Sequence, residues 1–311
     1  PVAQGCQAKC PFCFSHSSIS DDLNKRSLSM GRVSSVLDAA KAAGAERAVI
    51  TGGGEPMVTP LPLVLQMVRA CADRFASVIM ISNGYAISKL PPEDRLKALI
   101  ALRSAGLSVL SVSRHGVTEE NNTAVMRLGT NAERIASTFS EYKLDLLRAS
   151  SSDTVDRLSG LRLRWVCVLQ KGAVDSAAKL ASYLDWTVST GVTEVCFKEL
   201  YVSSTTESLY YDHDSNVYSR QHQVSLRLLT TFLEEHRATV VGALPWGCPI
   251  YELPWTCVHD GASVTAALKV VAYTEPTVYW ERQNRLCRSW NLMSDGDCYS
   301  SLETKESLMQ I

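Results

Sequence analysis

The sequence predicts an α/β fold, a partial (β/α)6 TIM-like barrel followed by a C-terminal α+β extension. Two observations predict it. Helix-like and strand-like segments alternate regularly from residue 31 to about 200, and beyond that stretch the pattern changes to short strand-like segments joined by turns. In the alternating stretch, short apolar segments rich in β-branched residues are separated by amphipathic segments of helical spacing. Such alternation is typical of a parallel sheet built from right-handed βαβ units and covered by helices. Roughly five to six units fit, fewer than the eight of a closed barrel.

The alternating elements can be assigned in order along the chain. Helices are expected where apolar residues recur at helical spacing, and several of these segments end in a glycine, which is a helix stop signal. The expected helices span residues 32–44, 62–75, 92–106, 131–150 and 174–191. Strands are expected in the short β-branched segments between them. The expected strands lie within residues 47–54, 77–84, 107–116, 161–172 and 193–202.

Two polar stretches, residues 148–160 and 203–223, are expected to be loops. The second is long and rich in tyrosine, as lids and binding loops often are. Beyond it we expect a helix at 224–237, a strand at 238–244 and then short strands joined by turns. The pair Asp295-Gly296 is a hairpin signal in this last part.

The chain is therefore divided into a partial barrel, residues 1–237, and a C-terminal extension, residues 238–311, that is expected to cover the barrel mouth. Because the sequence begins with Pro1 rather than methionine, a preceding segment is also expected.

Composition narrows the class of protein. With 311 residues and 46% hydrophobic content, the chain can bury a sizeable core. The net charge is -1 and no long run of Lys or Arg occurs, so nucleic acid is not an expected partner. No apolar stretch approaches the ~18 to 20 residues of a membrane span, and no signal-peptide pattern opens the sequence. We therefore expect no membrane partner and a cytoplasmic protein.

Three of the ten cysteines fall in one short segment, "GCQAKCPFCF", at Cys6, Cys10 and Cys13. A structural zinc site needs four protein ligands, and no second pair accompanies these three. Three thiolates on one loop suit a four-iron cluster whose fourth iron is left open for another molecule. By contrast, Cys71, Cys167 and Cys196 lie in apolar periodic segments and are expected to be buried hydrophobic residues.

The C-x3-C-x2-C loop resembles that of the radical S-adenosylmethionine (radical SAM) superfamily, and Phe12 occupies the family's aromatic position before the last cysteine. A second motif, "TGGGEP", resembles the family's Gly-Gly-Glu-Pro turn after the second strand. The matching residues are Gly53, Gly54, Glu55 and Pro56. The resemblance implies that Phe12 lies near the adenine of S-adenosylmethionine. It also implies that the turn approaches the methionyl end, with the acid or the backbone engaging the ammonium group.

Two further strand ends fit the resemblance, "ISNG" and "SVSRHG". In the family, such positions bind the ribose hydroxyls and the methionyl carboxylate of the cofactor. The candidates carried over are Ser82, Asn83, Ser111, Ser113 and Arg114. The planar donor fork of Arg114 suits a carboxylate. His115 is a candidate for substrate contact.

The resemblance implies a radical SAM enzyme. A one-electron donor such as flavodoxin or ferredoxin would reduce a [4Fe-4S] cluster held by the three cysteines, and S-adenosylmethionine would be cleaved to a 5'-deoxyadenosyl radical. The radical would abstract hydrogen from a small-molecule or peptide substrate, in a rearrangement, cyclisation, epimerisation or dehydrogenation. Two alternatives stay open. The first is a nucleotide cyclase of the molybdenum-cofactor type, because the segment "LCRSWNLMSDGDCYSSLE" of this chain loosely resembles the tail of those enzymes. The second is a non-catalytic cluster-binding interaction protein.

Four more cysteines lie in the tail, Cys248, Cys257, Cys287 and Cys298. They are candidates for a second iron-sulfur cluster, although the close cysteine pair of the cyclases and the seven-cysteine SPASM arrangement are missing from the sequence. Alternatively, Cys298 or a nearby tyrosine could donate a hydrogen atom, or all four could be single buried thiols.

Tryptophans and charged residues also gather in the tail. The set suits a site for a ring or a polar small molecule, and it equally suits a core with a charged rim. Its members are Trp246, Trp255, Trp280, Trp290, Glu275, Glu281, Arg282, Arg285 and Arg288.

Overall fold

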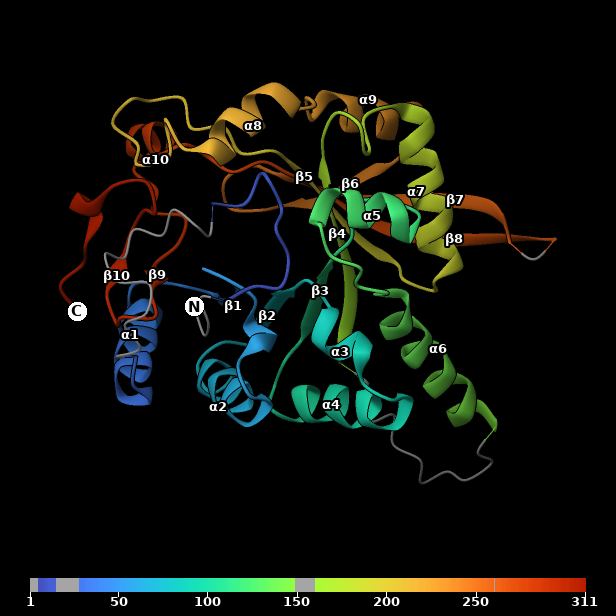
Figure 1. The fold of residues 1–311 in the computed structure, drawn as a ribbon, viewed down its shortest axis with the longest axis horizontal. Coiled ribbons are helices and arrows are strands. Elements are labelled where there is room, and N and C mark those ends of the chain that lie inside the picture. The colour runs from blue at the N-terminus through green and yellow to red at the C-terminus, as the bar shows by residue number, and fades with distance from the viewer. Residues whose placement is uncertain (1–4, 15–27, 149–159, 260) are drawn as a thin grey trace.

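The computed structural model describes residues 5–14, 28–148, 160–259 and 261–311. One eight-stranded sheet forms its centre, in the order β1-β2-β3-β4-β5-β8-β7-β6 (Figure 1). Strands β1 to β5 and β8 are parallel, whereas β7 runs antiparallel to β8 and β6 antiparallel to β7. The sheet confirms the predicted α/β partial barrel, with β8 as the sixth parallel strand. The strands are β1 (Arg47–Ile50), β2 (Ser77–Ser82), β3 (Val109–Ser113), β4 (Arg162–Leu169), β5 (Glu194–Glu199), β6 (Thr239–Ala243), β7 (Pro249–His259) and β8 (Ala262–Tyr273).

Each expected helix of the alternating part is present. They are α1 (Met30–Ala42), α2 (Leu61–Ala72), α4 (Pro92–Ser104), α6 (Glu133–Arg148) and α7 (Ala177–Ser189). Ser29 and Ser176 cap the first and the last of them, since each side chain accepts a hydrogen bond from a backbone N–H of the first turn. The shorter helices are α3 (Tyr85–Lys89), α5 (Glu119–Met126), α8 (Asp214–His222), α9 (Arg227–Glu235) and α10 (Val278–Asn284).

The helix-covered face of the sheet carries the main core. Trp165, Leu169 and Phe197 point to this face and are fully buried against the helices. Cys71 and Cys167 belong to the same core, and Cys196 is buried on the opposite face, so these three cysteines are the small hydrophobic residues that were predicted.

The opposite face forms the inside of the partial barrel, and strand register arranges it in layers. Near the start of the strands, Glu194 binds Arg162 at 2.7 Å and Arg164 at 3.0 Å. The next layer is apolar and consists of Val166, Cys196 and Val271. At the carboxyl ends of the strands, Lys198 of β5 lies opposite Tyr273 of β8. The inside therefore changes from an ion-pair layer, through an apolar layer, to a polar end.

The segment 203–223 differs from expectation, because residues 214–222 form α8 rather than a loop. The helix begins where the His213 side chain accepts a hydrogen bond from the backbone N–H of Ser215 at 3.2 Å. That cap is a local signal that the polar composition obscured. The other expected loop, 148–160, lies mostly outside the described residues.

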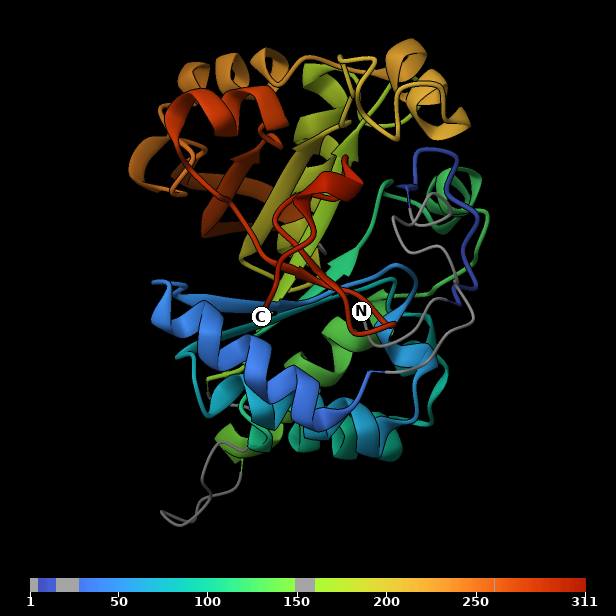
Figure 2. The same cartoon turned by 90° about the vertical axis from the view of Figure 1, so that its left-hand side faces the viewer.

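The C-terminal part also differs in detail. Instead of short strands, β7 and β8 form one long antiparallel hairpin that joins the main sheet. The sheet therefore contains strands from both sides of the expected boundary at residue 238. The domain division at that residue stays a prediction. The Asp295-Gly296 hairpin is confirmed: β9 (Asn291–Leu292) pairs with β10 (Cys298–Tyr299), and Gly296 has a φ of 92°. This hairpin lies beside α1, where Arg32 Nε donates to the Gly296 carbonyl at 2.8 Å (Figures 1 and 2).

Among the residues that the structure describes, no helix combines the length and the apolar character that crossing a bilayer requires.

Candidate active site

The cysteine loop, residues 5–14, is held by three elements that are far apart in the sequence. Cys6, Cys10 and Cys13 are free thiols and half-buried. The loop's anchors are hydrogen bonds from Glu55 N to Gly5 O at 2.9 Å, from Lys9 N to Met126 O at 2.9 Å and from Ser215 Oγ to Cys13 O at 2.7 Å. The glycine turn, the end of α5 and the start of α8 therefore fix the loop.

The charge relations of the three thiols fit a metal cluster. The pKa of Cys10 is raised to about 12, mainly by burial and in part by the negative charges of Cys13 and Cys6. Burial likewise raises the pKa of Cys6, to which Glu55 and Cys13 add. The thiols of Cys6 and Cys10, whose ionisation is opposed by burial and by nearby negative charges, need a cationic partner to become thiolates, and a [4Fe-4S] cluster bound by three cysteines supplies one. Within the described ranges no three Cys, His, Asp or Glu side chains are placed to hold a single metal ion.

The glycine turn after β1 has a steric requirement that the motif did not reveal. A Cβ atom on Gly52 would lie 1.8 Å from the carbonyl oxygen of Gly54, far inside contact distance. Gly54 itself has a φ of 153°. Only glycine fits at residue 52 without rebuilding the turn. Gly52 is therefore a site residue that sequence reasoning missed, since the motif was read from Gly53 onward.

Glu55 ties this turn to the end of β2. Its carboxylate is buried and accepts hydrogen bonds from Met57 N at 3.0 Å, Ser82 Oγ at 2.7 Å and Asn83 N at 2.6 Å. Burial raises the pKa of Glu55, while these three bonds favour the carboxylate form. The side chain is thus occupied by protein donors. Its assignment to the cofactor ammonium, like that of Gly53, Gly54 and Pro56, stays a prediction.

Asn83 carries the same connection on to the cysteines. Its Nδ2 lies 3.2 Å from Gln7 Oε1 and 3.7 Å from Cys6 Sγ. The structure therefore brings Glu55, Ser82, Asn83 and Cys6 together.

The predicted residues at the end of β3 separate into two groups. Ser111 is buried and Ser113 half-buried, both on the inner face of the sheet. Arg114 points the other way, into the helix layer, and is completely buried. Its guanidinium forms ion pairs with Glu119 and Glu133 and donates to the Val117 carbonyl at 2.9 Å. Arg114 therefore has structural partners, and its role toward a cofactor carboxylate stays a prediction.

His115 joins the cysteine loop to the sheet. Its ring lies edge-on to Phe12 with 5.4 Å between centroids, and its Nδ1 accepts a hydrogen bond from Val168 N at 3.1 Å. Burial lowers the pKa of His115 to about 3, and the charges of Arg114 and Lys198 contribute. The imidazole is therefore neutral at pH 7, with its proton on Nε2.

The tyrosine-rich segment and the C-terminal tail meet at the other side of the cysteine loop. Phe14 packs on Tyr210 with 4.7 Å between centroids and on Tyr201 with 5.8 Å. The Tyr201 hydroxyl and Ser203 Oγ both donate to the buried carboxylate of Glu303, the latter at 3.0 Å. This contact was missed because Glu303 is about a hundred residues from its partners and carries no motif.

The tail cysteines do not gather. Cys248, Cys257 and Cys298 are buried, and Cys287 is exposed. Cys248 Sγ lies 3.3 Å from both the amide and the carbonyl of Thr274. In the part of the chain that the structure describes, no three of these cysteines form a metal-binding group, and a second cluster is not shown.

Residues 1–145 match the family model of the Radical SAM superfamily. The fold is similar to that of Streptococcus suis SuiB bound to S-adenosylmethionine, with a TM-score of 0.55 and 14% identity over 96% of this chain and 58% of SuiB. A second SuiB structure gives 0.53 and 15% over 97% and 59%. SuiB bound to the precursor peptide SuiA gives 0.47 and 15% over 79% and 54%.

No curated protein matches the sequence. At these identities the structural likeness shows the fold, and the chain spans less than two thirds of the SuiB chains. The family match covers both motifs whose residues the structure brings together, the cysteine loop and the glycine turn. The similarity to the radical SAM superfamily model therefore extends over residues 1–145 of the 311-residue chain.

Proposed function

We propose that the protein is a radical SAM enzyme acting on a small-molecule or peptide substrate. The observation that carries the proposal is the direct connection between the two motifs: Glu55 N donates to Gly5 O, and Asn83 approaches Cys6. A loop that bound a cluster only for stability would need no such turn beside it. A cluster with bound S-adenosylmethionine would supply a 5'-deoxyadenosyl radical that abstracts hydrogen from the substrate.

The residues of this chain would hold and orient these groups. Cys6, Cys10 and Cys13 would bind three irons of a [4Fe-4S] cluster. Phe12, fixed by the edge of His115, would lie against the adenine. The backbone of the glycine turn, with Ser82, Asn83, Ser111 and Ser113, would contact the remainder of S-adenosylmethionine. The packing of Phe14 on Tyr201 and Tyr210 would exclude water from that side.

Biosynthetic tailoring is the proposed reaction class, by rearrangement, cyclisation, epimerisation or dehydrogenation. Flavodoxin or ferredoxin is the proposed electron donor, and the cytoplasm the proposed location. No observation on the described residues favours the nucleotide-cyclase alternative.

The test is anaerobic reconstitution of the cluster, followed by incubation with dithionite and S-adenosylmethionine and chromatography for 5'-deoxyadenosine. We expect the wild-type protein to form it and Cys13→Ala to form none. Cys287→Ala, which removes an exposed cysteine far from the loop in sequence, is the matched control and should retain activity. If protein with a complete cluster forms no 5'-deoxyadenosine, the enzyme proposal is wrong and the non-catalytic cluster-binding protein replaces it.

Counting iron in the triple variant Cys6→Ala, Cys10→Ala, Cys13→Ala tests the tail. We expect essentially none; about four irons per chain would reveal a second cluster.

A further inference from the structure

A group of charged residues, Lys198, Glu275 and Arg288, lies with Tyr273 at the carboxyl ends of β5 and β8, on the inner face of the sheet. Lys198 Nζ is 4.3 Å from the centroid of the Tyr273 ring and 3.9 Å from Glu275 Oε2. The other oxygen of Glu275 meets Arg288 Nη1 at 2.5 Å. One carboxylate therefore holds two cations, one from the sheet and one from the C-terminal tail.

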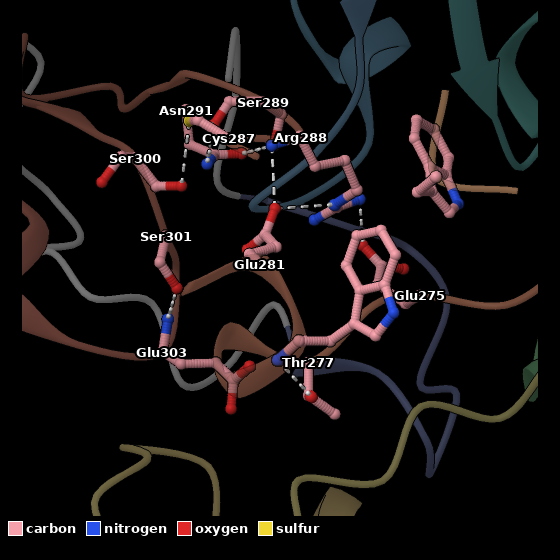
Figure 3. A network of polar contacts seen from close by, with 12 residues as sticks. Glu275, Thr277, Glu281, Cys287, Arg288, Ser289, Asn291, Ser300, Ser301 and Glu303 are labelled. Atoms are coloured by element: carbon pink, nitrogen blue, oxygen red, sulfur yellow. Dashed lines mark hydrogen bonds and ion pairs between the residues drawn. The ribbon is translucent and has the colours of Figure 1, made fainter. Parts of the chain in front are cut away.

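Arg288 is fixed in place from several sides. Its Nη1 also donates to the Tyr273 hydroxyl at 3.2 Å, and its backbone N–H donates to Glu281 Oε1 at 2.8 Å. Figure 3 shows the Arg288 side chain reaching between Glu281 and Glu275. The ring of Trp246 lies 5.9 Å from the guanidinium carbon. A cation held this firmly is preorganised for a ligand.

Both cations keep unused hydrogen-bond donors. Arg288 Nε is buried and has no hydrogen-bond partner among the described residues, since Glu281 Oε1 is 4.0 Å away, too far for a hydrogen bond. The Lys198 ammonium has three donors, and its closest carboxylate oxygen among the described residues is the one 3.9 Å away on Glu275. The Lys198 and Arg288 side chains retain 28% and 20% exposure, so each is partly open to solvent.

The carboxylates near Lys198 and Arg288, unlike these two cations, already have hydrogen-bond or ion-pair partners. Glu275 has a cation at each oxygen, Glu281 accepts from the Arg288 amide, and Glu303 accepts from Tyr201 and Ser203. Burial favours the neutral acid, but Arg288 and Lys198 outweigh it and hold the pKa of Glu275 below its usual value. Burial also favours the neutral amine, but Tyr273 and Glu275 outweigh it and hold the pKa of Lys198 above its usual value. The unmet hydrogen-bonding capacity is therefore on the cations.

We propose that Lys198 and Arg288 bind a carboxylate group of the substrate. The inference rests on the proposed function, because this group of charged residues lies at the strand ends where the two family motifs also lie. A carboxylate accepts from a guanidinium edge and an ammonium group together, and it would fill Arg288 Nε. The site is within electrostatic reach of the cofactor side, since the Lys198 charge contributes to the low pKa of His115, which contacts Phe12.

The test measures binding of a carboxylate and its neutral analogue, N-acetylglycine and N-acetylglycinamide, to the anaerobically reconstituted protein by saturation-transfer NMR titration. We expect the acid to bind the wild-type protein and the amide not to bind measurably. Lys198→Met and Arg288→Gln should each weaken acid binding about tenfold or more, as loss of a charge-assisted hydrogen bond does. Lys269→Met is the matched control. It removes an exposed lysine of β8 that pairs with Glu194, at the other end of the β5–β8 pairing from Lys198, and should bind the acid as wild type does.

The proposal is overturned if wild-type protein binds the acid no better than the amide, or if both variants bind the acid as tightly as the control does. Formation of 5'-deoxyadenosine without substrate is measured on the same samples. Lys198→Met should retain it, because Lys198 is not assigned to the cofactor. Absence of 5'-deoxyadenosine from wild-type protein with a full cluster would contradict the proposed function, whereas normal formation with no carboxylate preference would contradict the carboxylate site alone.

Discussion

The rings of Phe12 and His115 meet edge to face, and the same imidazole accepts a hydrogen bond from Val168 N. One buried histidine thus connects the cysteine loop to the end of β4. Because the histidine is neutral, it can accept on Nδ1, and protonation there would break the bond to Val168.

This relationship predicts a pH dependence of stability. The pKa of His115 is about 3 in the folded chain, against about 6.5 for an unperturbed histidine. Between these values the unfolded chain binds a proton that the folded chain does not. The free energy of unfolding should therefore fall as the pH is lowered from about 6.5, by up to about 1.4 kcal/mol per pH unit. Urea unfolding of the cluster-free chain at pH 7, 6 and 5 measures this slope.

His115→Asn should lose that component of the pH dependence, whereas His259→Asn, at an exposed position, should behave as wild type. An unchanged slope in His115→Asn would show that other groups cause the acid sensitivity.

Gly52→Ala should distort the glycine turn, because the new methyl group would meet the Gly54 carbonyl. We expect 5'-deoxyadenosine formation to be lost and the free energy of unfolding to fall by about 1–3 kcal/mol. Gly242→Ala is the control, since a Cβ there meets no atom within 4 Å. Equal activity of the two variants would mean that the turn tolerates a side chain and that its close approach is unimportant.

Arg114→Met should be strongly destabilising even without any cofactor. The change removes two ion pairs and a hydrogen bond of a completely buried cation and should cost about 1.5–3 kcal/mol, because the side chains of Glu119 and Glu133 keep 32% and 36% exposure. Lys97→Met breaks the exposed pair with Asp94 and should cost less than about 1 kcal/mol. Urea unfolding of the cluster-free chain decides: if Arg114→Met is as stable as wild type and loses only S-adenosylmethionine binding, Arg114 is a cofactor ligand instead.

The parallel sheet could be predicted from sequence because its signals are local. Each β-branched strand and each amphipathic helix is recognisable within its own ten to fifteen residues, as with Glu194–Glu199 and Ala177–Ser189. The same holds for the cysteine loop, whose chemistry depends on spacing within residues 6–13. The start of α8 was missed because its segment is polar and lacks hydrophobic periodicity, and its cap is a single hydrogen bond from Ser215 N to the His213 ring.

Long-range contacts could not be predicted in the same way. The sequence does not reveal that Glu133, nineteen residues on, faces Arg114, or that Glu275 and Arg288 come from the tail to meet Lys198. The aromatic and charged tail residues were recognised as a set, but their partners depend on where β8 enters the sheet. Gly52 was missed for a different reason, since the need for glycine there comes from one backbone approach.

The position of β8 between β5 and β7 has a consequence for how the chain folds. Until residues 262–273 have been synthesised, β5 is an unpaired edge strand, open to association with other chains. The pairing that closes this edge spans about seventy residues of sequence, from Glu194–Glu199 to Ala262–Tyr273, which makes it a high-contact-order and therefore late event. The tail that delivers Arg288 follows directly on the strand that protects the sheet from aggregation.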